Sequence, residues 1–279
     1  MTQVISRIDH VVIEAEDERA VFDFFHERLG LPVAWPMAQW GPIHEGGINI
    51  GNCNIGCNHK LDPNSPDEPR IVAVGFEPHG GLNAALGALD LMGFEHSEPI
   101  PSGEIDLPYA PWNAGWTNVM LFRPTPVSFL CEYHHDAAER RRAAIEALAA
   151  SPNPLGIRGI LNTHSNTTDW PGWELLLADG YGTDEGTYFD YDDSIGAGVD
   201  EDYYWGLTFD VASLDQAASA LGNLGIGFQE GIANWDGLDR LDSLQLNEEE
   251  FFGEELYVSF CNREEKLRRL RDEWLGLRG

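Results

Sequence analysis

The chain has 279 residues, of which 43% are hydrophobic, so it is long enough to bury a sizeable core without disulfides. Its 47 acidic residues against 17 basic ones give a formal net charge of -30, and only Lys60 and Lys266 are lysines. Such a charge repels phosphate backbones and anionic membranes, so we expect no nucleic-acid or membrane partner and a monomer or homodimer that binds a small molecule.

The first 60 residues predict a strand, a helix and three more strands. "IDHVVIEA" (8–15) is short and β-branched, which is typical of a strand. A helix with apolar side chains at i, i+3, i+4 and i+8 follows from Asp17, which can cap it, and Gly30 lies just past its end. The extended segments between Gly and Pro residues are 31–35, 41–50 and 52–59. The predicted unit is β-α-β-β-β.

The same order recurs after the Pro- and Asp-rich segment 61–69. We predict a strand at 70–78, a helix at 80–94 and closing strands at 115–124 and 127–134. The N-terminus has no signal-peptide pattern and no run reaches about 18 apolar residues, so we expect a cytoplasmic protein.

The second half of the chain is a diverged copy of the first. "GFEPHGGLNAALGALDLMGF" (75–94) matches "TFDVASLDQAASALGNLGIGF" (208–228), and "VSFLCE" (127–132) matches "VSFCNR" (258–263) at a similar offset. The third unit, from residue 157 to about 202, is shorter and has no clear helix, so we expect it to be degenerate. The predicted parts are 1–136, a helical linker at 137–156, 157–263, and a C-terminal amphipathic helix at 264–279.

Four cysteines show no C-x-x-C pair, which argues against a disulfide framework and a zinc ribbon. Cys53 and Cys57 are four apart in "GNCNIGCN" and share a strand face. We expect both to be small buried hydrophobic residues, with a shared metal as the alternative.

"IDHVVIEAED" (8–17), "FFHERLGL" (24–31) and "VSFLCEY" (127–133) resemble the first strand, helix and last strand of the vicinal oxygen chelate superfamily. This superfamily includes glyoxalases, bleomycin-resistance proteins and extradiol dioxygenases. The resemblance implies an α+β fold in which four βαβββ modules pair into two barrels. It also implies a divalent metal that chelates two adjacent oxygens of a substrate.

The resemblance places His10 at the first-strand ligand position and Glu132 at the last-strand carboxylate position. An imidazole and a carboxylate form half of a site for iron, which we expect first, or for manganese, nickel or zinc. His44, or His134 on the same strand face as Glu132, could supply a third ligand.

Other expected ligand positions carry no ligand. Ala73 and Gly56 occupy two of them in the N-terminal half, while Gly159 or a neighbour and Arg263 stand in the places of His10 and Glu132 in the C-terminal half. A metal is therefore expected in the N-terminal barrel, or not at all.

Aromatic residues cluster in the loops and strand ends of the first half and predict a cleft for an aromatic or hydrophobic ligand: Trp35, Trp40, Tyr109, Trp112 and Trp116. The resemblance implies a metal-dependent enzyme of dioxygenase, lyase or isomerase type. The alternative is a metal-free protein that binds and sequesters a small molecule, as resistance proteins of this superfamily do.

Overall fold

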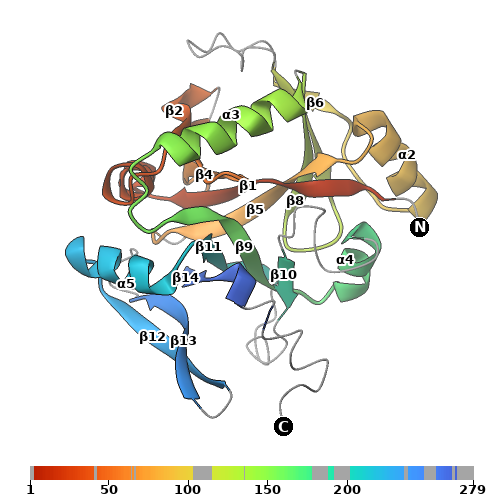
Figure 1. Ribbon diagram of the computed structural model, residues 1–279. Coiled ribbons are helices and arrows are strands. Elements are labelled where there is room, and N and C mark those ends of the chain that lie inside the picture. The colour runs from red at the N-terminus through yellow and green to blue at the C-terminus, as the bar shows by residue number, and fades with distance from the viewer. Residues whose placement is uncertain are drawn as a thin grey trace.

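Figure 1 shows the computed structural model, in which two curled β-sheets lie side by side and helices cover their outer faces. The structure describes residues 3–40, 43–63, 65, 67–102, 115–134, 136–177, 188–191, 202–235, 238–247, 256–265 and 268. The expected mixed α+β class with barrel-like sheets is confirmed. No helix in the described part of the chain is long and apolar enough to cross a membrane.

The first sheet has eight strands in the order β2-β3-β4-β1-β5-β8-β7-β6. Their bounds are β1 Ile5–Ala15, β2 Val33–Trp40, β3 Ile43–Asn49, β4 Asn54–His59, β5 Arg70–Pro78, β6 Ile100–Pro101, β7 Trp116–Leu121 and β8 Ser128–Tyr133. Two β-α-β-β-β units meet where β1 pairs with β5. The predicted strands of this half are thus present.

The second sheet has six strands in the order β10-β9-β11-β14-β13-β12. Their bounds are β9 Ile157–Asn166, β10 Tyr188–Tyr191, β11 Tyr203–Val211, β12 Phe228–Trp235, β13 Leu238–Leu246 and β14 Tyr257–Cys261. The helices are α1 Glu18–Asp23, the π-helix η1 Phe24–Arg28, α2 Leu82–Met92, α3 Ala137–Ala150, α4 Trp170–Leu177 and α5 Leu214–Asn223. Most of the predicted C-terminal helix lies outside the described residues.

The helix predicted after Asp17 is present, but it changes its winding. The Asp17 side chain accepts a hydrogen bond from the Ala20 N–H at 2.9 Å, as a cap does. From Phe24 to Arg28 the helix is a π-helix, which a spacing of apolar residues cannot distinguish from an α-helix. Gly30 follows with a positive φ of 67°, the conformation that glycine adopts most easily.

The third unit contains a helix, α4, so the expectation that it lacks one is wrong. In "DWPGWELLL" the Pro and Gly masked the periodicity, but both lie in the first turn, where proline is well tolerated. Trp173, Leu176 and Leu177 are buried, and the Trp173 ring meets Phe76 of β5 at 6.0 Å. Packing against the first half therefore stabilises α4.

Each curled sheet has two different faces. The outer face of the first sheet and the helices form the main apolar core, together with residues of the second half. On the inner face Ala73, Phe129 and Cys131 form a separate small cluster with Val12 and Trp116 packed against it. We call this inner face of β1, β3, β4, β5, β7 and β8 the concave face.

Several contacts join the two halves directly. Asn52, in the loop before β4, donates from Nδ2 to the Ile160 carbonyl at 2.8 Å and accepts from the Ile160 N–H at 2.9 Å. The buried Phe25 ring of η1 lies 6.1 Å from Phe209 of β11. The linker helix α3 crosses the first sheet (Figure 1), and Asn49 donates to its Ala144 carbonyl at 2.7 Å.

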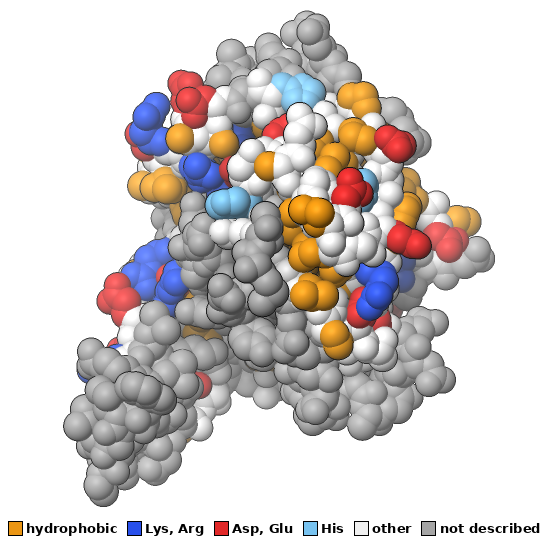
Figure 2. Space-filling model, turned by 90° about the vertical axis from the view of Figure 1, so that its right-hand side faces the viewer, with side chains coloured by type: hydrophobic (Ala, Val, Ile, Leu, Met, Phe, Trp, Pro, Cys, Tyr) orange, Lys and Arg blue, Asp and Glu red, His pale blue; other side chains and the backbone are white. Residues whose placement is uncertain are grey.

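All four cysteines, Cys53, Cys57, Cys131 and Cys261, are buried and free of disulfides. This confirms the expectation for Cys53 and Cys57 as small buried residues. On the surface, Figure 2 shows hydrophobic side chains exposed on one face among acidic ones. Exposed side chains such as Leu91 and Phe122 bury little area, so stability depends little on them.

Candidate functional site

Asp9 and His10 lie together at a β-bulge in β1. Pairing with β5 shifts register between Ile8 and His10, which leaves Asp9 as the extra residue. In a regular strand, consecutive side chains point to opposite faces, but here His10 Nδ1 lies 2.7 Å from Asp9 Oδ2. The irregularity of one strand therefore creates a carboxylate–imidazole pair.

The Asp9 carboxylate is fully buried and accepts hydrogen bonds on both oxygens. Arg140 of α3 donates to Oδ1 at 2.5 Å, and the Tyr133 hydroxyl donates to Oδ2 at 3.0 Å. Burial by itself raises the pKa of Asp9, but Arg140, His10 and Arg7 outweigh it and hold that pKa well below its usual range. Asp9 is thus an anion, and His10 Nδ1 carries the hydrogen that it accepts.

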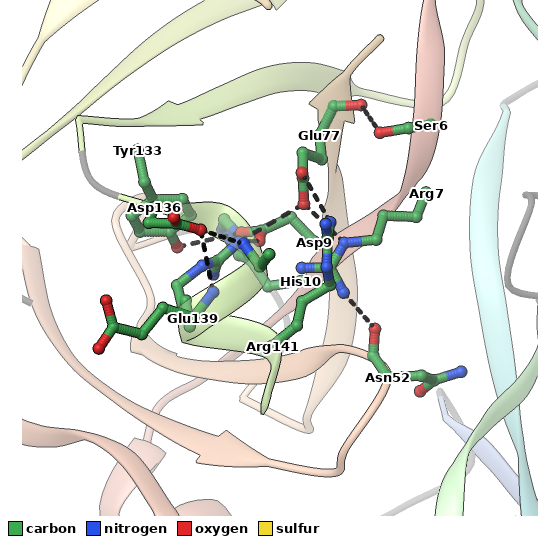
Figure 3. Close-up of polar contacts among 12 residues, drawn as sticks. Ser6, Arg7, Asp9, His10, Asn52, Glu77, Tyr133, Asp136, Glu139 and Arg141 are labelled. Atoms are coloured by element: carbon green, nitrogen blue, oxygen red, sulfur yellow. Dashed lines mark hydrogen bonds and ion pairs between the residues drawn. The ribbon is translucent and has the colours of Figure 1, made fainter. Parts of the chain in front are cut away.

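A second carboxylate extends this network (Figure 3). Glu77 of β5 accepts from Arg7 at 2.6 Å and from Arg141 at 2.9 Å, and lies 3.7 Å from Arg140. The Arg140 guanidinium also lies 3.7 Å from the Tyr133 ring centre. Two carboxylates and three guanidiniums thus hold α3 across one end of the concave face.

Aromatic rings surround the His10 imidazole. Phe129 contacts it edge-on at 5.2 Å and Trp35 at 6.0 Å. Gly75 leaves the space, because a Cβ there would lie 2.8 Å from Phe129 and 3.0 Å from His10. Because Nδ1 is bound to Asp9, Nε2 is the ring nitrogen left to accept a hydrogen bond or a proton from a ligand.

Further polar groups lie on the concave face. Glu45 of β3 alternates with Gly47, across which the Trp35 ring packs so closely that a Cβ would lie 2.2 Å away. Burial raises the pKa of Glu45, although His10 and a hydrogen bond from Asn58 oppose the shift. The buried Trp35 Nε1 and Asn58 Oδ1 have no hydrogen-bond partner. This part of the concave face therefore offers a free donor and a free acceptor.

Glu132 is not brought to His10. Its Oε1 accepts from the Leu82 N–H at 2.7 Å, at the first turn of α2. Its neighbour Cys131 belongs to the cluster on the concave face, so strand alternation puts Glu132 on the outer face. Glu132 thus caps a helix in this structure.

His44 and His134 also lie away from His10. His44 Nδ1 bonds to Glu18 Oε1 at 2.5 Å, on the side of β3 that faces α1. His134, just past β8, lies 2.8 Å from the Thr117 hydroxyl in an exposed position. Of the three candidate histidines only His10 lies on the concave face.

The pairing register identifies the positions beside His10. Gly75 of β5 pairs with His10, and Phe129 of β8 pairs with Gly75. Ala73 and Gly56, where sequence comparison expected ligands, both pair with Val12 instead. On the β5 side, the next two residues of this row are therefore a glycine and a phenylalanine, and neither side chain can bind a metal.

Among the described residues, one group of potential ligands has the spacing of a metal site: Asp9, His10 and Cys131, whose ligand atoms lie within 4.8 Å of one another. The Asp9 oxygens, however, already accept from Arg140, Tyr133 and His10. Burial and the Asp9 charge raise the pKa of the Cys131 thiol, which disfavours the thiolate that binds metals. As arranged, these residues do not fit a divalent metal.

Trp35 and Trp116 are the two predicted aromatic residues that the structure places on the concave face. Trp116 lies 6.4 Å from the Tyr133 ring. Tyr109 and Trp112 are outside the described residues, and so is the side chain of Trp40. The aromatic lining is therefore described in part.

Sequence reasoning did not select Asp9, Tyr133, Arg140 or Glu77. One signal was available, since Arg7 and Asp9 are charged residues inside an otherwise apolar strand segment, and buried charges need partners. Arg140, which is 131 positions from Asp9, could not be chosen among the three consecutive arginines of the linker helix.

On the outer face, the Glu18 carboxylate interacts with two histidines, His44 at 2.5 Å and His59 at 2.9 Å. The hydrogen bond to Glu18 raises the pKa of His59, and burial opposes this shift only in part. At Glu18 burial raises the pKa of the carboxyl group, but the hydrogen bonds from His44 and His59 outweigh burial and lower it. Protonated His59 therefore stabilises the fold below its unfolded pKa, and this contribution is lost as pH rises through its folded pKa.

We expect the difference in free energy of unfolding between wild type and Glu18→Gln to shrink from about pH 6 to about pH 9. Urea unfolding at several pH values measures it. A difference that grows with pH over this range would contradict the assignment, and Asp23→Asn, an exposed pair with Arg19, is the control.

No family model matches the chain, and no curated protein is similar to it. Solved structures are similar over almost the whole chain. The Mn(II)-bound glyoxalase from Novosphingobium aromaticivorans has a TM-score of 0.55 at 11% identity and covers 92% of this chain and 82% of its own. The 2,3-dioxygenase LapB from Pseudomonas sp. KL28 has a TM-score of 0.59 at 11% identity and covers 94% of both chains.

A mutant of 4-hydroxymandelate synthase from Streptomyces coelicolor reaches a TM-score of 0.59 at 13% identity, over 96% of this chain and 97% of its own. These similarities concern the overall fold, and they agree with the mixed α+β class with barrel-like sheets. At such low identity the likeness concerns the fold, and function must be argued from the site.

Proposed function

We propose that the concave face binds a small aromatic or hydrophobic molecule beside His10 without a metal. The observation that carries the proposal is the His10–Asp9 pair, whose carboxylate is held by Arg140 and Tyr133. This arrangement fixes the imidazole and leaves Nε2 as a basic acceptor among Trp35 and Phe129. A ligand with a hydroxyl group and a flat apolar body suits it.

The same pair can move a proton. A ligand hydroxyl that donates to His10 Nε2 can transfer its hydrogen there, and Asp9 stabilises the imidazolium that results. Binding and acid–base catalysis therefore use the same geometry, and a site without a metal could perform either.

A metal-dependent enzyme of the dioxygenase, lyase or isomerase type is the second candidate. One observation favours it: the ligand atoms of Asp9, His10 and Cys131 lie within 4.8 Å of one another. For iron, manganese, nickel or zinc to bind there, Asp9 would have to leave Arg140 and Tyr133, and the Cys131 thiol would have to lose its proton.

The test uses 4-nitrophenol, a small aromatic hydroxyl compound whose absorbance reports its ionisation. We expect saturable binding that His10→Ala weakens at least about tenfold, because a buried hydrogen bond is lost. The matched control is His134→Ala, which removes an exposed histidine from the other side of the sheet. Equal affinity in wild type and His10→Ala would overturn the proposal.

Metal analysis of the same preparations separates the two candidates. We expect no stoichiometric iron, manganese, nickel or zinc after incubation with each ion. One bound metal per chain that disappears in both His10→Ala and Cys131→Ala would replace the first candidate with the second.

A further inference from the structure

We propose that the second sheet holds a separate binding site for a small planar amide, formed by Asn162, His164 and Trp205. This site lies in the other half of the chain and goes beyond the function proposed for the concave face.

The two sheets are built in the same register, which locates the site. β5 and β11 have the same sequence of buried and half-buried residues, and each pairs with its partner across a bulge at the same place. His10 follows the bulge in β1, and Asn162 follows the bulge in β9. Asn162, rather than Gly159, therefore stands in the place of His10.

The rest of the row follows from the same register. Thr208 pairs with Asn162 and with Ser259, so Thr208 corresponds to Gly75 and Ser259 corresponds to Phe129. The correspondence continues to Asn262 in the place of Glu132, which replaces the alignment with Arg263. A row that is aromatic and apolar in the first half is polar in the second.

This row is buried and hydrogen-bonded. Asn162 is 4% exposed, and its Nδ2 lies 3.5 Å from His164 Nδ1. His164 Nε2 lies 2.7 Å from the Thr208 hydroxyl, which in turn lies 2.8 Å from the Ser259 hydroxyl. We call these four residues the polar row.

Two polar atoms at the polar row have no partner. Asn162 Oδ1 and Trp205 Nε1 are both buried and unpaired. The Trp205 ring lies 4.5 Å from the His164 ring at an angle of 30°, and Tyr257 closes on both rings at 5.4 and 5.6 Å. Because buried donors and acceptors are rarely left unpaired, these two indicate a polar ligand.

The unpaired groups define the chemistry of that ligand. Asn162 Oδ1 needs a donor and Trp205 Nε1 needs an acceptor, and an amide supplies an N–H and a carbonyl side by side. The aromatic rings favour a planar molecule. The polar row contains no lysine or arginine that could pair with a negatively charged ligand, so a carboxylate of the same shape should be rejected.

In the experiment, the 279-residue chain is titrated with benzamide and with benzoate in a calorimeter. We expect saturable benzamide binding that Asn162→Leu weakens at least about tenfold, and benzoate binding at least about tenfold weaker than benzamide. Trp205→Phe removes the indole N–H but keeps an aromatic ring, and we expect it to weaken benzamide binding by a similar factor. This variant tests the site independently if Asn162→Leu does not fold.

Thr163→Val is the matched control. Its buried hydroxyl is also unpaired, but Thr163 alternates with Asn162 and points to the opposite face, so benzamide affinity should not change. His10→Ala should likewise leave benzamide binding intact while it weakens 4-nitrophenol binding. The proposal is overturned by no benzamide binding, by equal affinity for benzoate, or by affinity unchanged in both site variants.

Discussion

Replacing Arg140 with methionine is expected to lower the free energy of unfolding by about 3 to 5 kcal/mol. The substitution leaves the fully buried Asp9 carboxylate without its closest cation, and it removes the guanidinium from the Tyr133 ring. Because Arg140 keeps the pKa of Asp9 low, wild-type stability from this pair is present above the unfolded pKa of Asp9 and is lost as pH falls. Urea unfolding at neutral pH measures the effect.

The matched control is Arg141→Met on the next residue of α3. Arg141 binds Glu77, but its side chain is 32% exposed, so we expect a loss below about 1 kcal/mol. Combining Arg140→Met with Asp9→Leu should recover much of the stability, because the buried charge is then gone. Equal losses for the two arginine variants would show that the Asp9 pair does not anchor α3.

Phe25→Ala is expected to cost about 3 to 5 kcal/mol and to destabilise both halves together. The Phe25 ring is completely buried and contacts Phe209 of the second sheet at 6.1 Å, so its loss leaves a cavity between the two sheets. Denaturant unfolding followed by tryptophan fluorescence and by circular dichroism should still give one shared transition, at a lower midpoint.

Phe122→Ala serves as the surface control, because Phe122 is 56% exposed and its removal should change stability by no more than about 0.5 kcal/mol. Two separate transitions already in the wild type, of which Phe25→Ala shifts only one, would mean that the ring does not join the halves.

Local patterns predicted much of the fold. The strand at 70–78 is present with the same bounds, and Asp17 caps the first helix as expected. Both features depend on neighbours in sequence, namely a β-branched segment and one oxygen near a helix start. The α4 helix was missed because its stability comes from burial of Trp173 against the first half, which no local pattern records.

The candidate site was predicted less well, for a geometric reason. The alternation of side chains along a β-strand predicts that Cys131 and Glu132 point to opposite faces of the sheet, but it does not predict which face is concave. The bulge before His10 adds one residue to the strand, so side chains on the two sides of the bulge no longer follow one pattern of alternation. His10 lies on the concave face, and the positions of Asp9 and Arg140 depend on that bulge and on a helix far along the chain.

The hydrogen bonds of Asn52 have a consequence for where the chain can be divided. Its side chain satisfies both backbone groups of Ile160, while its own carbonyl accepts from Arg7 at 3.0 Å. A fragment that ends within the linker would expose the Asn52 amide and the Phe25 ring on one piece and open backbone groups of β9 on the other. The boundary of the sequence repeat therefore does not separate two parts that are complete on their own, and we expect the two halves to fold as one unit.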